Sequence, residues 1–371
     1  MITTPPERAV PAGATPPAAS TPGRLRTLDG LRFLAAAGVV LYHFTARSPE
    51  WGVPAGERFP VLGQVAIYLS LAPELFFVIS GFVILWTAWG RSVPDVVASR
   101  VARIYPAYWA ALALTAALLA VWWPARVSAG QVAVNATLLQ SLVGVRNVDT
   151  VYWTLWAELR FYLLVVALVA VGLTRTRVLA FAALWPPLAM LAEQRHAEPF
   201  ATLLLGQYAP FFAGGMALFL VWRDGHAWRP WLVVAGNAVL GVRGVAAGRD
   251  AALTRLTVFD PSLPLLAAAV VGCFGLVALV TLTPLRRWDW SGLTAIGALT
   301  YPLYLVHEAW GRFTIDLLAP HLSSYATLLA AVAVSVLLAV VVHKFVEEPL
   351  HGPVRRAVRR VLSRPAAPAT A

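Results

Sequence analysis

The sequence predicts an all-α, polytopic integral membrane protein with about ten transmembrane helices and both termini in the cytoplasm. Of its 371 residues, 59% are hydrophobic and only 13% are charged, and the mean hydropathy is +0.70. A soluble domain of this length needs more charge to cover its surface. Apolar runs of about 20 residues, enough for a helix to cross a bilayer core, recur along the chain. Many of the 15 tryptophans lie at the ends of these runs, where indole rings favour the membrane–water interface.

Ten apolar segments follow one another between two polar ends. They lack the period-two alternation of barrel strands, so helices are the spanning structure that we expect. The fifth segment carries two prolines and the seventh an asparagine and glycines, which makes these two the weakest. The segments cover residues 29–46, 64–89, 105–123, 153–173, 178–193, 203–222, 229–245, 262–283, 292–311 and 323–346.

The two ends of the chain differ from the middle in composition. Residues 1–27 are rich in Pro, Ala and Thr and contain no apolar run, which predicts a disordered cytoplasmic tail without a signal peptide. Residues 351–371 are basic and then rich in Pro and Ala, which predicts a second cytoplasmic tail. The membrane domain therefore extends over residues 28–350.

The distribution of basic residues sets the expected orientation. With the N-terminus inside, the cytoplasmic segments carry twice as many Lys and Arg residues as the outer loops. The net charge of +11 follows from this bias, and scattered single arginines do not favour nucleic-acid binding. The single cysteine, Cys273, excludes a disulfide within the chain, and no His/Cys cluster indicates a metal. We expect a multi-pass protein of the plasma membrane.

Ionisable side chains inside the spans are the candidates for chemistry, because each costs about 2.5–3.5 kcal/mol at the bilayer centre unless it lines a cavity or is paired. They are Arg32, His43, Glu74, Glu158, Arg160, His307 and Glu308. Arg32 and His43 are eleven residues apart, so they share one helix face and lie about 16 Å apart along its axis. The alternative is that Arg32 is an interfacial anchor and His43 a boundary residue.

Six motifs in order resemble those of the bacterial acyltransferase-3 family. The first, LDGLRFLAAAGVVLYHF, holds an Arg-x10-His pattern at Arg32 and His43. The second has Glu74 where the family more often has Asp. The six motifs are residues 28–44, 74–82 (ELFFVISGF), 100–106 (RVARIYP), 153–164 (WTLWAELRFYLL), 299–310 (LTYPLYLVHEAW) and 345–350 (FVEEPL). The family is known for ten membrane spans, in agreement with the segments counted above.

The resemblance implies a membrane O-acyltransferase that carries an acyl group, most simply acetyl, from acyl-CoA to a hydroxyl. The acceptor would be a glycan, a lipid-linked sugar or a natural product, with no bound cofactor. A neutral histidine suits the general base, so His43 is expected to be catalytic. Glu74 or Glu158 would hold its imidazole in one tautomer, and the sequence does not choose between them. Glu158 could instead form a structural pair with Arg160.

The remaining motif residues receive expected binding roles. Arg32, Arg100 and Arg103 would grip the phosphates of the donor, although the positive-inside bias also explains Arg100 and Arg103. Tyr301, Tyr304 and His307 would line the substrate channel, or else pack helices with a polar handle. The Ser80–Gly81 pair favours close helix packing over a nucleophilic serine.

Two other functions remain open at this point. A transporter or flippase for a small polar substrate or glycolipid would also bury Arg, His and Glu along a path. Its discriminator is whether thioester is consumed. The chain has no phosphate-binding Gly-x4-Gly-Lys-Ser/Thr loop, so ATP-driven transport is not indicated. A binding scaffold with a decayed site is the third reading, against which Arg32, His43 and Glu158 are all retained.

Overall fold

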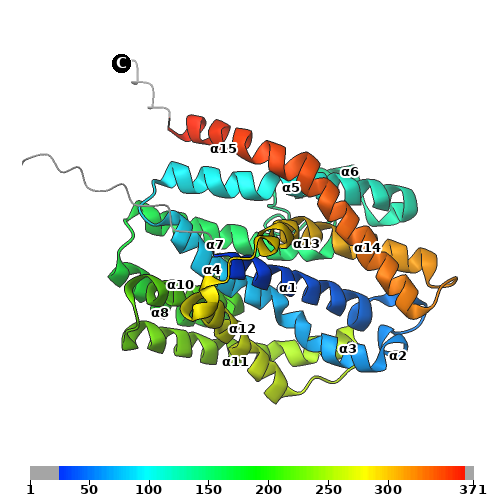
Figure 1. The fold of residues 1–371 in the computed structure, drawn as a ribbon, viewed down its shortest axis with the longest axis horizontal. Coiled ribbons are helices and arrows are strands. Elements are labelled where there is room, and N and C mark those ends of the chain that lie inside the picture. The colour runs from blue at the N-terminus through cyan, green and yellow to red at the C-terminus, as the bar shows by residue number, and fades with distance from the viewer. Residues whose placement is uncertain (1–24, 364–371) are drawn as a thin grey trace, which may run out of the picture.

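The computed structural model describes residues 25–363, without the side chains of residues 249–252, 254 and 255. The predicted N-terminal tail lies outside this range except for its last three residues, as do residues 364–371 of the C-terminal tail. The described residues form helices and no β-strand (Figure 1), so the predicted all-α class is confirmed.

The described chain folds into a bundle of long helices joined by short turns. The elements are α1 (Arg26–Tyr42), α2 (Ala55–Arg58), α3 (Pro60–Ala66), α4 (Ala72–Ala88), α5 (Val93–Trp122), α6 (Ala129–Asn135), α7 (Trp153–Ala170), α8 (Arg175–Gln194), α9 (Phe200–Leu204), α10 (Ala209–Asp224), α11 (Trp228–Leu256), α12 (Leu263–Leu282), α13 (Ser291–Leu318), α14 (Ser324–Val342) and α15 (Glu348–Leu362).

Every predicted membrane segment coincides with one of these helices. Within residues 25–363, seven helical stretches are long and apolar enough to cross a membrane, namely Pro60–Ala88, Val93–Trp122, Thr150–Ala170, Phe200–Asp224, Trp228–Gly248, Leu263–Leu282 and Ser324–Leu362. The other three predicted segments correspond to α1, α8 and α13. The membrane-spanning character is therefore supported, while the count of ten and the orientation stay predictions.

Side-chain caps fix where several helices begin. The hydroxyls of Ser92, Thr174 and Ser323 accept the backbone N–H three residues later, at the starts of α5, α8 and α14. Each of these bonds satisfies one of the N–H groups that a helix start leaves unpaired. The polar residues in the short turns between apolar runs thus fix where these helices begin.

Helix α1 is central to the bundle and packs along α13, α4 and α12 (Figure 1). Small residues allow the close approach to α13. A Cβ atom at Gly297 would meet the backbone and Cβ of Asp29, and one at Gly311 would overlap the ring of Phe44. Small residues commonly let membrane helices approach closely. This packing sets the C-terminal end of α1 against the middle of α13, where the sequence places His307 and Glu308.

Helices α4 and α10 pack against each other through a reciprocal pair of glycines. A Cβ at Gly81 would overlap the backbone carbonyl of Phe212, and one at Gly215 would overlap that of Val78. The contact leaves no room for any side chain, so Gly81 serves helix packing, as the sequence predicts. Since α4 carries both Glu74 and Ser80, this contact also positions polar groups of the bundle interior.

The basic segment after residue 350 is helical in the structure. Helix α15 follows α14 after a π-helical turn, His343–Glu347, and lies along α5 (Figure 1). Ion pairs hold both ends of this contact: Arg103 binds Glu347, and Arg359 Nε lies 2.9 Å from Asp95 Oδ1. The part of the predicted tail that the structure describes, residues 351–363, is therefore packed against the membrane domain.

Replacing Gly81 by Ala should lower the free energy of unfolding by about 1–3 kcal/mol, because the added methyl group must displace backbone atoms of α10. Gly272→Ala in α12 is the matched control, since a Cβ there has nothing within 4 Å. Thermal unfolding of both variants in detergent measures the difference. Equal melting temperatures for the two variants would contradict the close contact of α4 and α10.

Candidate active site

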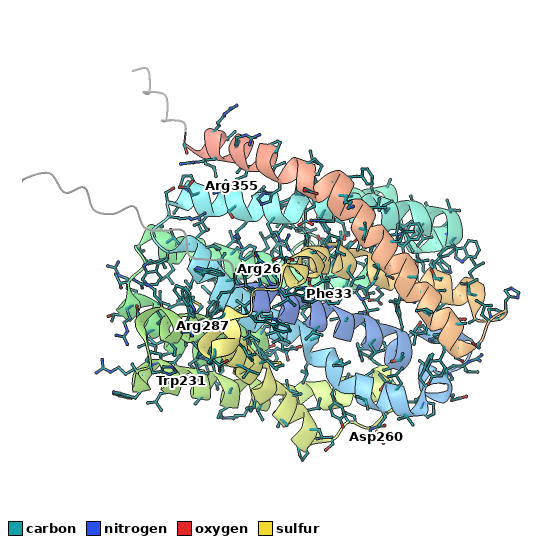
Figure 2. All side chains as sticks on the ribbon, viewed as in Figure 1. Arg26, Phe33, Trp231, Asp260, Arg287 and Arg355 are labelled. Carbon is teal, nitrogen blue, oxygen red and sulfur yellow. The ribbon has the colours of Figure 1, made fainter. Side chains whose placement is uncertain are left out.

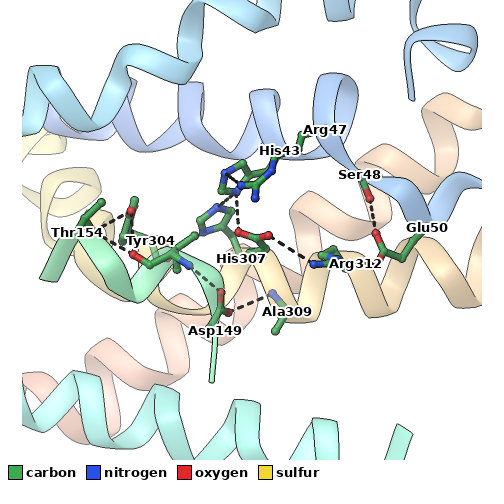
Figure 3. Close-up of polar contacts among 12 residues, drawn as sticks. His43, Arg47, Ser48, Glu50, Asp149, Thr154, Tyr304, His307, Ala309 and Arg312 are labelled. Atoms are coloured by element: carbon green, nitrogen blue, oxygen red, sulfur yellow. Dashed lines mark hydrogen bonds and ion pairs between the residues drawn. The ribbon is translucent and has the colours of Figure 1, made fainter. Parts of the chain in front are cut away.

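His43 lies at the end of α1, where the helix widens into a π-helical turn, His43–Arg47. Such turns are frequent at functional sites. Its Nδ1 lies 2.9 Å from Nε2 of His307 and 3.2 Å from Oε2 of Glu308, so two neighbouring residues of α13 face one ring nitrogen (Figure 3). The two imidazole rings are stacked with centroids 5.0 Å apart. The first and ninth predicted spans are joined by this contact.

The hydrogen-bond partners fix the tautomers of the two histidines. Nδ1 of His307 lies 2.9 Å from the carbonyl oxygen of Tyr304, which can only accept, so His307 Nδ1 carries a proton. In the neutral ring its Nε2 is then an acceptor. His43 Nδ1 must therefore be the donor, to His307 Nε2 or to Glu308. The Nε2 lone pair of His43 is left facing away from α13, where Arg47 Nη1 approaches it at 3.5 Å.

Glu308 also contacts a cation on its own helix, Arg312. Arg312, one turn further along α13, lies 3.6 Å from Glu308 Oε1 through its Nη1, and its Nε donates to Glu50 Oε1 at 2.7 Å. Ser48 donates to the other oxygen of Glu50 at 3.0 Å. The Glu308 side chain is only 6% exposed, so this chain of contacts supplies the partners that a buried carboxylate needs.

Asp149 lies just before the span that begins at Thr150, and it ties α7 to α13. Its Oδ1 accepts the N–H of Val151 at 3.2 Å and its Oδ2 accepts the N–H of Ala309 at 3.3 Å (Figure 3). Burial, followed by the nearby Glu308 carboxylate, raises the pKa of Asp149 to about 7. Asp149 is therefore the acid of this contact that takes up a proton near neutral pH.

Two cavities flank the contact between His43 and Glu308. The first, of about 230 Å³, is lined by His43 and Arg47 on one side and by Trp153 and Tyr304 on the other. The second, of about 600 Å³, has apolar walls that include Trp123 and Trp153, and it is also lined by the polar and charged side chains of Glu308, Arg312, Asp149, Arg126, Gln131, Arg146 and Asn147. Thr150 and Trp153 line both cavities, so the two cavities adjoin at the η5 turn (Thr150–Tyr152) and the first residue of α7.

A third cavity, of about 220 Å³, lies around the N-terminal half of α1. Arg32, Arg100 and Arg103 line it together with Tyr301 and Tyr304, so the three predicted donor-binding residues and two of the three predicted channel residues share one space, while His307 does not line it. Its remaining walls include Phe76, Phe77, Val83, Ile104 and Leu155. Pro73 and Tyr304 line both this cavity and the one beside His43, so the two cavities adjoin there.

The polar contacts of this third cavity leave one guanidinium without a partner. Arg103 binds Glu347 and lies over the ring of Tyr301, with 5.3 Å between its Cζ and the ring centroid. Arg100 Nη2 donates to Ser99 at 3.0 Å and to Thr87 at 3.4 Å. For Arg32 no hydrogen bond or ion pair to any described residue is found. The cavity therefore offers a cation that an anionic ligand can pair.

Glu158 lies in this third cavity, apart from the space that His43 faces. Its Oε1 accepts from Ser80 Oγ at 2.8 Å and from the hydroxyl of Tyr162. Arg160 does not contact Glu158 through a described ion pair and donates instead to the backbone of Trp156 and Thr202. Glu74 is buried in the first turn of α4, next to Pro73.

The carboxylate that touches His43 is thus Glu308, whereas the sequence led us to expect Glu74 or Glu158 in that role. The sequence marks Glu308 as an ionisable residue of a span without giving it a role, and it gives no functional role to Arg47, Arg312 or Asp149. One signal could have found the two arginines, because each follows its partner by four residues: Arg47 follows His43 and Arg312 follows Glu308. Asp149 carries no such local signal.

Tyr304 lies where two of the cavities adjoin, and its hydroxyl is fixed by α7 and the turn before it. It receives a hydrogen bond from Thr154 Oγ1 at 2.9 Å and lies 3.3 Å from the carbonyl oxygen of Val151. Tyr301, one turn earlier on α13, donates to the carbonyl oxygen of Ile104 at 3.0 Å. Both predicted channel tyrosines line cavities, and both also join helices.

The chain was compared with known proteins. The model of the acyltransferase-3 family, described as an acyltransferase domain, matches residues 25–344. No curated protein and no solved structure matches the chain.

The buried pair of Glu50 and Arg312 should be coupled by about 1–3 kcal/mol in a double-mutant cycle of Leu substitutions, since breaking one partner leaves the other charge buried. The exposed pair of Arg26 and Asp289 is the control, because Asp289 is 76% exposed and solvent screens the pair. Its coupling should stay under about 1 kcal/mol. Thermal unfolding in detergent gives both values, and a coupling of Glu50 and Arg312 no larger than that of the control would contradict the network around Glu308.

Proposed function

Because the chain belongs to the acyltransferase-3 family and is a membrane acyltransferase, we propose that it transfers an acyl group, most simply acetyl, from acyl-CoA to a hydroxyl of a carbohydrate or another small acceptor. One observation carries this proposal. The Nδ1 of His43 contacts His307 and Glu308, and the His43 side chain lines a cavity that shares Pro73 and Tyr304 with the arginine-lined cavity. A base and an anion-binding space therefore meet near Tyr304.

The arginine-lined cavity suits an acyl-CoA donor. Its apolar side chains match an acyl chain and the pantetheine arm, and the unpaired guanidinium of Arg32 suits an anionic group. The volume of about 220 Å³ lies below the range of about 300–1,000 Å³ that encloses a drug-sized ligand. The cavity therefore holds the arm of the donor, and the nucleotide remains at its mouth. The thioester carbonyl would lie near Tyr304, at the junction with the His43 cavity.

The two spaces at the other end of the site suit a polar acceptor. The reacting hydroxyl would enter the cavity beside His43. The rest of a larger acceptor would occupy the cavity of about 600 Å³ on the far side of Thr150 and Trp153. There Trp123 and Trp153 offer aromatic faces, and Gln131, Asn147 and Asp149 offer hydrogen-bonding groups. This combination is the one by which a polyhydroxylated molecule is held.

In the proposed reaction His43 acts as general base and then as general acid. Its Nε2 takes the proton of the acceptor hydroxyl as the oxygen attacks the thioester carbonyl carbon. The tetrahedral intermediate collapses, the C–S bond breaks, and the thiolate takes the proton from the imidazolium. Glu308 stabilises the imidazolium through Nδ1–H, as a carboxylate next to a catalytic histidine does. Arg47, 3.5 Å from Nε2, is placed to stabilise the oxyanion.

Substituting Ala for His43 should lower the rate of acyl transfer by about 10²–10⁴-fold, because the proton of the acceptor then has no positioned base. The measurement is release of free CoA from acetyl-CoA by membrane vesicles of cells that make the protein. His321→Ala, on an exposed turn, is the control and should keep the wild-type rate. Equal amounts of folded protein in both vesicle preparations show that insertion is unaffected.

Two outcomes of the same assay would contradict the proposal. His43→Ala vesicles that release CoA at the wild-type rate would remove the catalytic role of His43. Wild-type vesicles that carry a labelled glycan or glycolipid across the bilayer without any release of CoA would favour the transporter.

Where acyl transfer is observed, a comparison of cell-surface glycans and secreted metabolites by mass, with and without the gene, would identify the acceptor through one lost acyl increment.

A further inference from the structure

Helix α15 carries three features that the proposed reaction does not use: a histidine that lines the arginine-lined cavity, a half-buried arginine on the same face, and a fixed position along α5. The family match ends at residue 344, before this helix begins at Glu348. The FVEEPL motif (345–350) covers the junction of α14 and α15, whereas His351 and Arg355 lie beyond both that motif and the family match.

The position of α15 is fixed at both ends by ion pairs. At its start Glu347 is held by Arg103 and by His343, whose Nδ1 lies 2.9 Å from Glu347 Oε2. Near its end Arg359 pairs with Asp95, in the first turn of α5. The start of α15 thus lies near Arg103, and its end lies near Asp95, which precedes Arg103 in α5. The two helices therefore run antiparallel. Figure 1 shows α15 along α5 over this length.

The face of α15 that meets α5 reaches the mouth of the cavity. His351 lines the cavity together with Ser99, Arg100 and Arg103 of α5. Arg355 follows His351 by four residues, so it lies on the same face one turn further out. Arg103, Arg355 and Arg100, together with the Glu347 carboxylate, are close enough to His351 for their charges to act on it. Figure 2 labels Arg355 on α15, beside α5.

Arg355 has no counter-charge among the described residues. It is half-buried, and no hydrogen bond or ion pair of its side chain to any described residue is found, whereas Arg359 and Arg103 each have an acidic partner. A half-buried guanidinium beside other cations is costly unless an anion binds there. The mouth of the cavity therefore has an excess of positive charge where the arm of the donor would emerge.

We propose that α15 forms the outer wall of the donor site, and that Arg355, with His351, binds a phosphate group of the nucleotide end of acyl-CoA. This rests on the proposed function, because it takes acyl-CoA as the donor. The guanidinium presents a planar fork that fits phosphate oxygens, and His351 offers a ring N–H. The cavity encloses the arm of the donor, and α15 selects donors that carry phosphate over those that end at pantetheine. Phosphate chemistry is also offered by phospholipid headgroups, so the test separates the two sources.

The test measures dissociation constants of CoA and of pantetheine with purified full-length protein in lipid-free detergent and in nanodiscs that contain anionic phospholipid. Wild-type protein should bind CoA more tightly than pantetheine. Arg355→Ala should weaken CoA binding by about tenfold, the loss of a charge-assisted contact, and leave pantetheine binding unchanged. Arg360→Ala is the matched control, because Arg360 lies on the exposed side of α15. His351→Ala should weaken CoA binding in the same direction.

Four results would overturn the assignment, and a fifth would refute only the proposed function. A loss of CoA binding that appears only in anionic nanodiscs would assign Arg355 to a lipid headgroup. An equal loss for CoA and pantetheine would show that the variant disturbs the cavity as a whole, and an equal effect of Arg360→Ala would show a general charge effect. Wild-type protein that binds CoA but never cleaves acetyl-CoA would refute the proposed function and leave the phosphate site standing. Conversely, wild-type transfer with unaltered CoA binding in Arg355→Ala would refute only this site.

Discussion

The contact of His43 with His307 and Glu308 is the interaction on which the site depends. His43 and His307 are 264 positions apart in the chain. Nδ1 of His43 lies 2.9 Å from Nε2 of His307 and 3.2 Å from Oε2 of Glu308. Small residues at Gly297 and Gly311 let α1 and α13 come close enough for it. In an apolar bundle these groups persist because they contact one another, and the outcome is an unprotonated Nε2 of His43, with Arg47 Nη1 at 3.5 Å, as the candidate base.

The two ends of α1 line different cavities of the site. At the N-terminal half, Arg32 faces a mostly apolar cavity with Arg100 and Arg103, which suits an anionic molecule with a long arm. At the C-terminal end, His43 faces a cavity that adjoins a larger one, which polar and charged side chains also line. The two regions meet at Pro73 and Tyr304. Such a division brings together reactants of different polarity while the bundle keeps the reacting atoms oriented.

The fold could be predicted from the sequence because hydropathy and length act locally. The ten apolar segments overlap helices of the described chain, seven stretches of which are long and apolar enough to cross a membrane, and the stripe of Arg32 and His43 along α1 follows from helix geometry alone. The partner of His43 could not be found this way, because it depends on which turn of α13 meets the end of α1. Glu74 and Glu158 were equally plausible by motif, and only the packing shows Glu308 in contact. Helix α15 was read as a tail because Arg, Pro353 and low hydropathy dominate it, and ion pairs to α5 override that composition.

The role of His43 as a base requires one tautomer, with a proton on Nδ1 and none on Nε2. Solid-state nitrogen NMR of protein labelled with ¹⁵N-histidine, in lipid at neutral pH, measures it directly, and the signals of His43 are identified by their loss in His43→Gln protein. We expect a protonated Nδ1 and an unprotonated Nε2 for His43, with a shift of its Nδ1 signal in Glu308→Gln protein. A proton on Nε2, or signals of His43 that do not respond to Glu308→Gln, would contradict it.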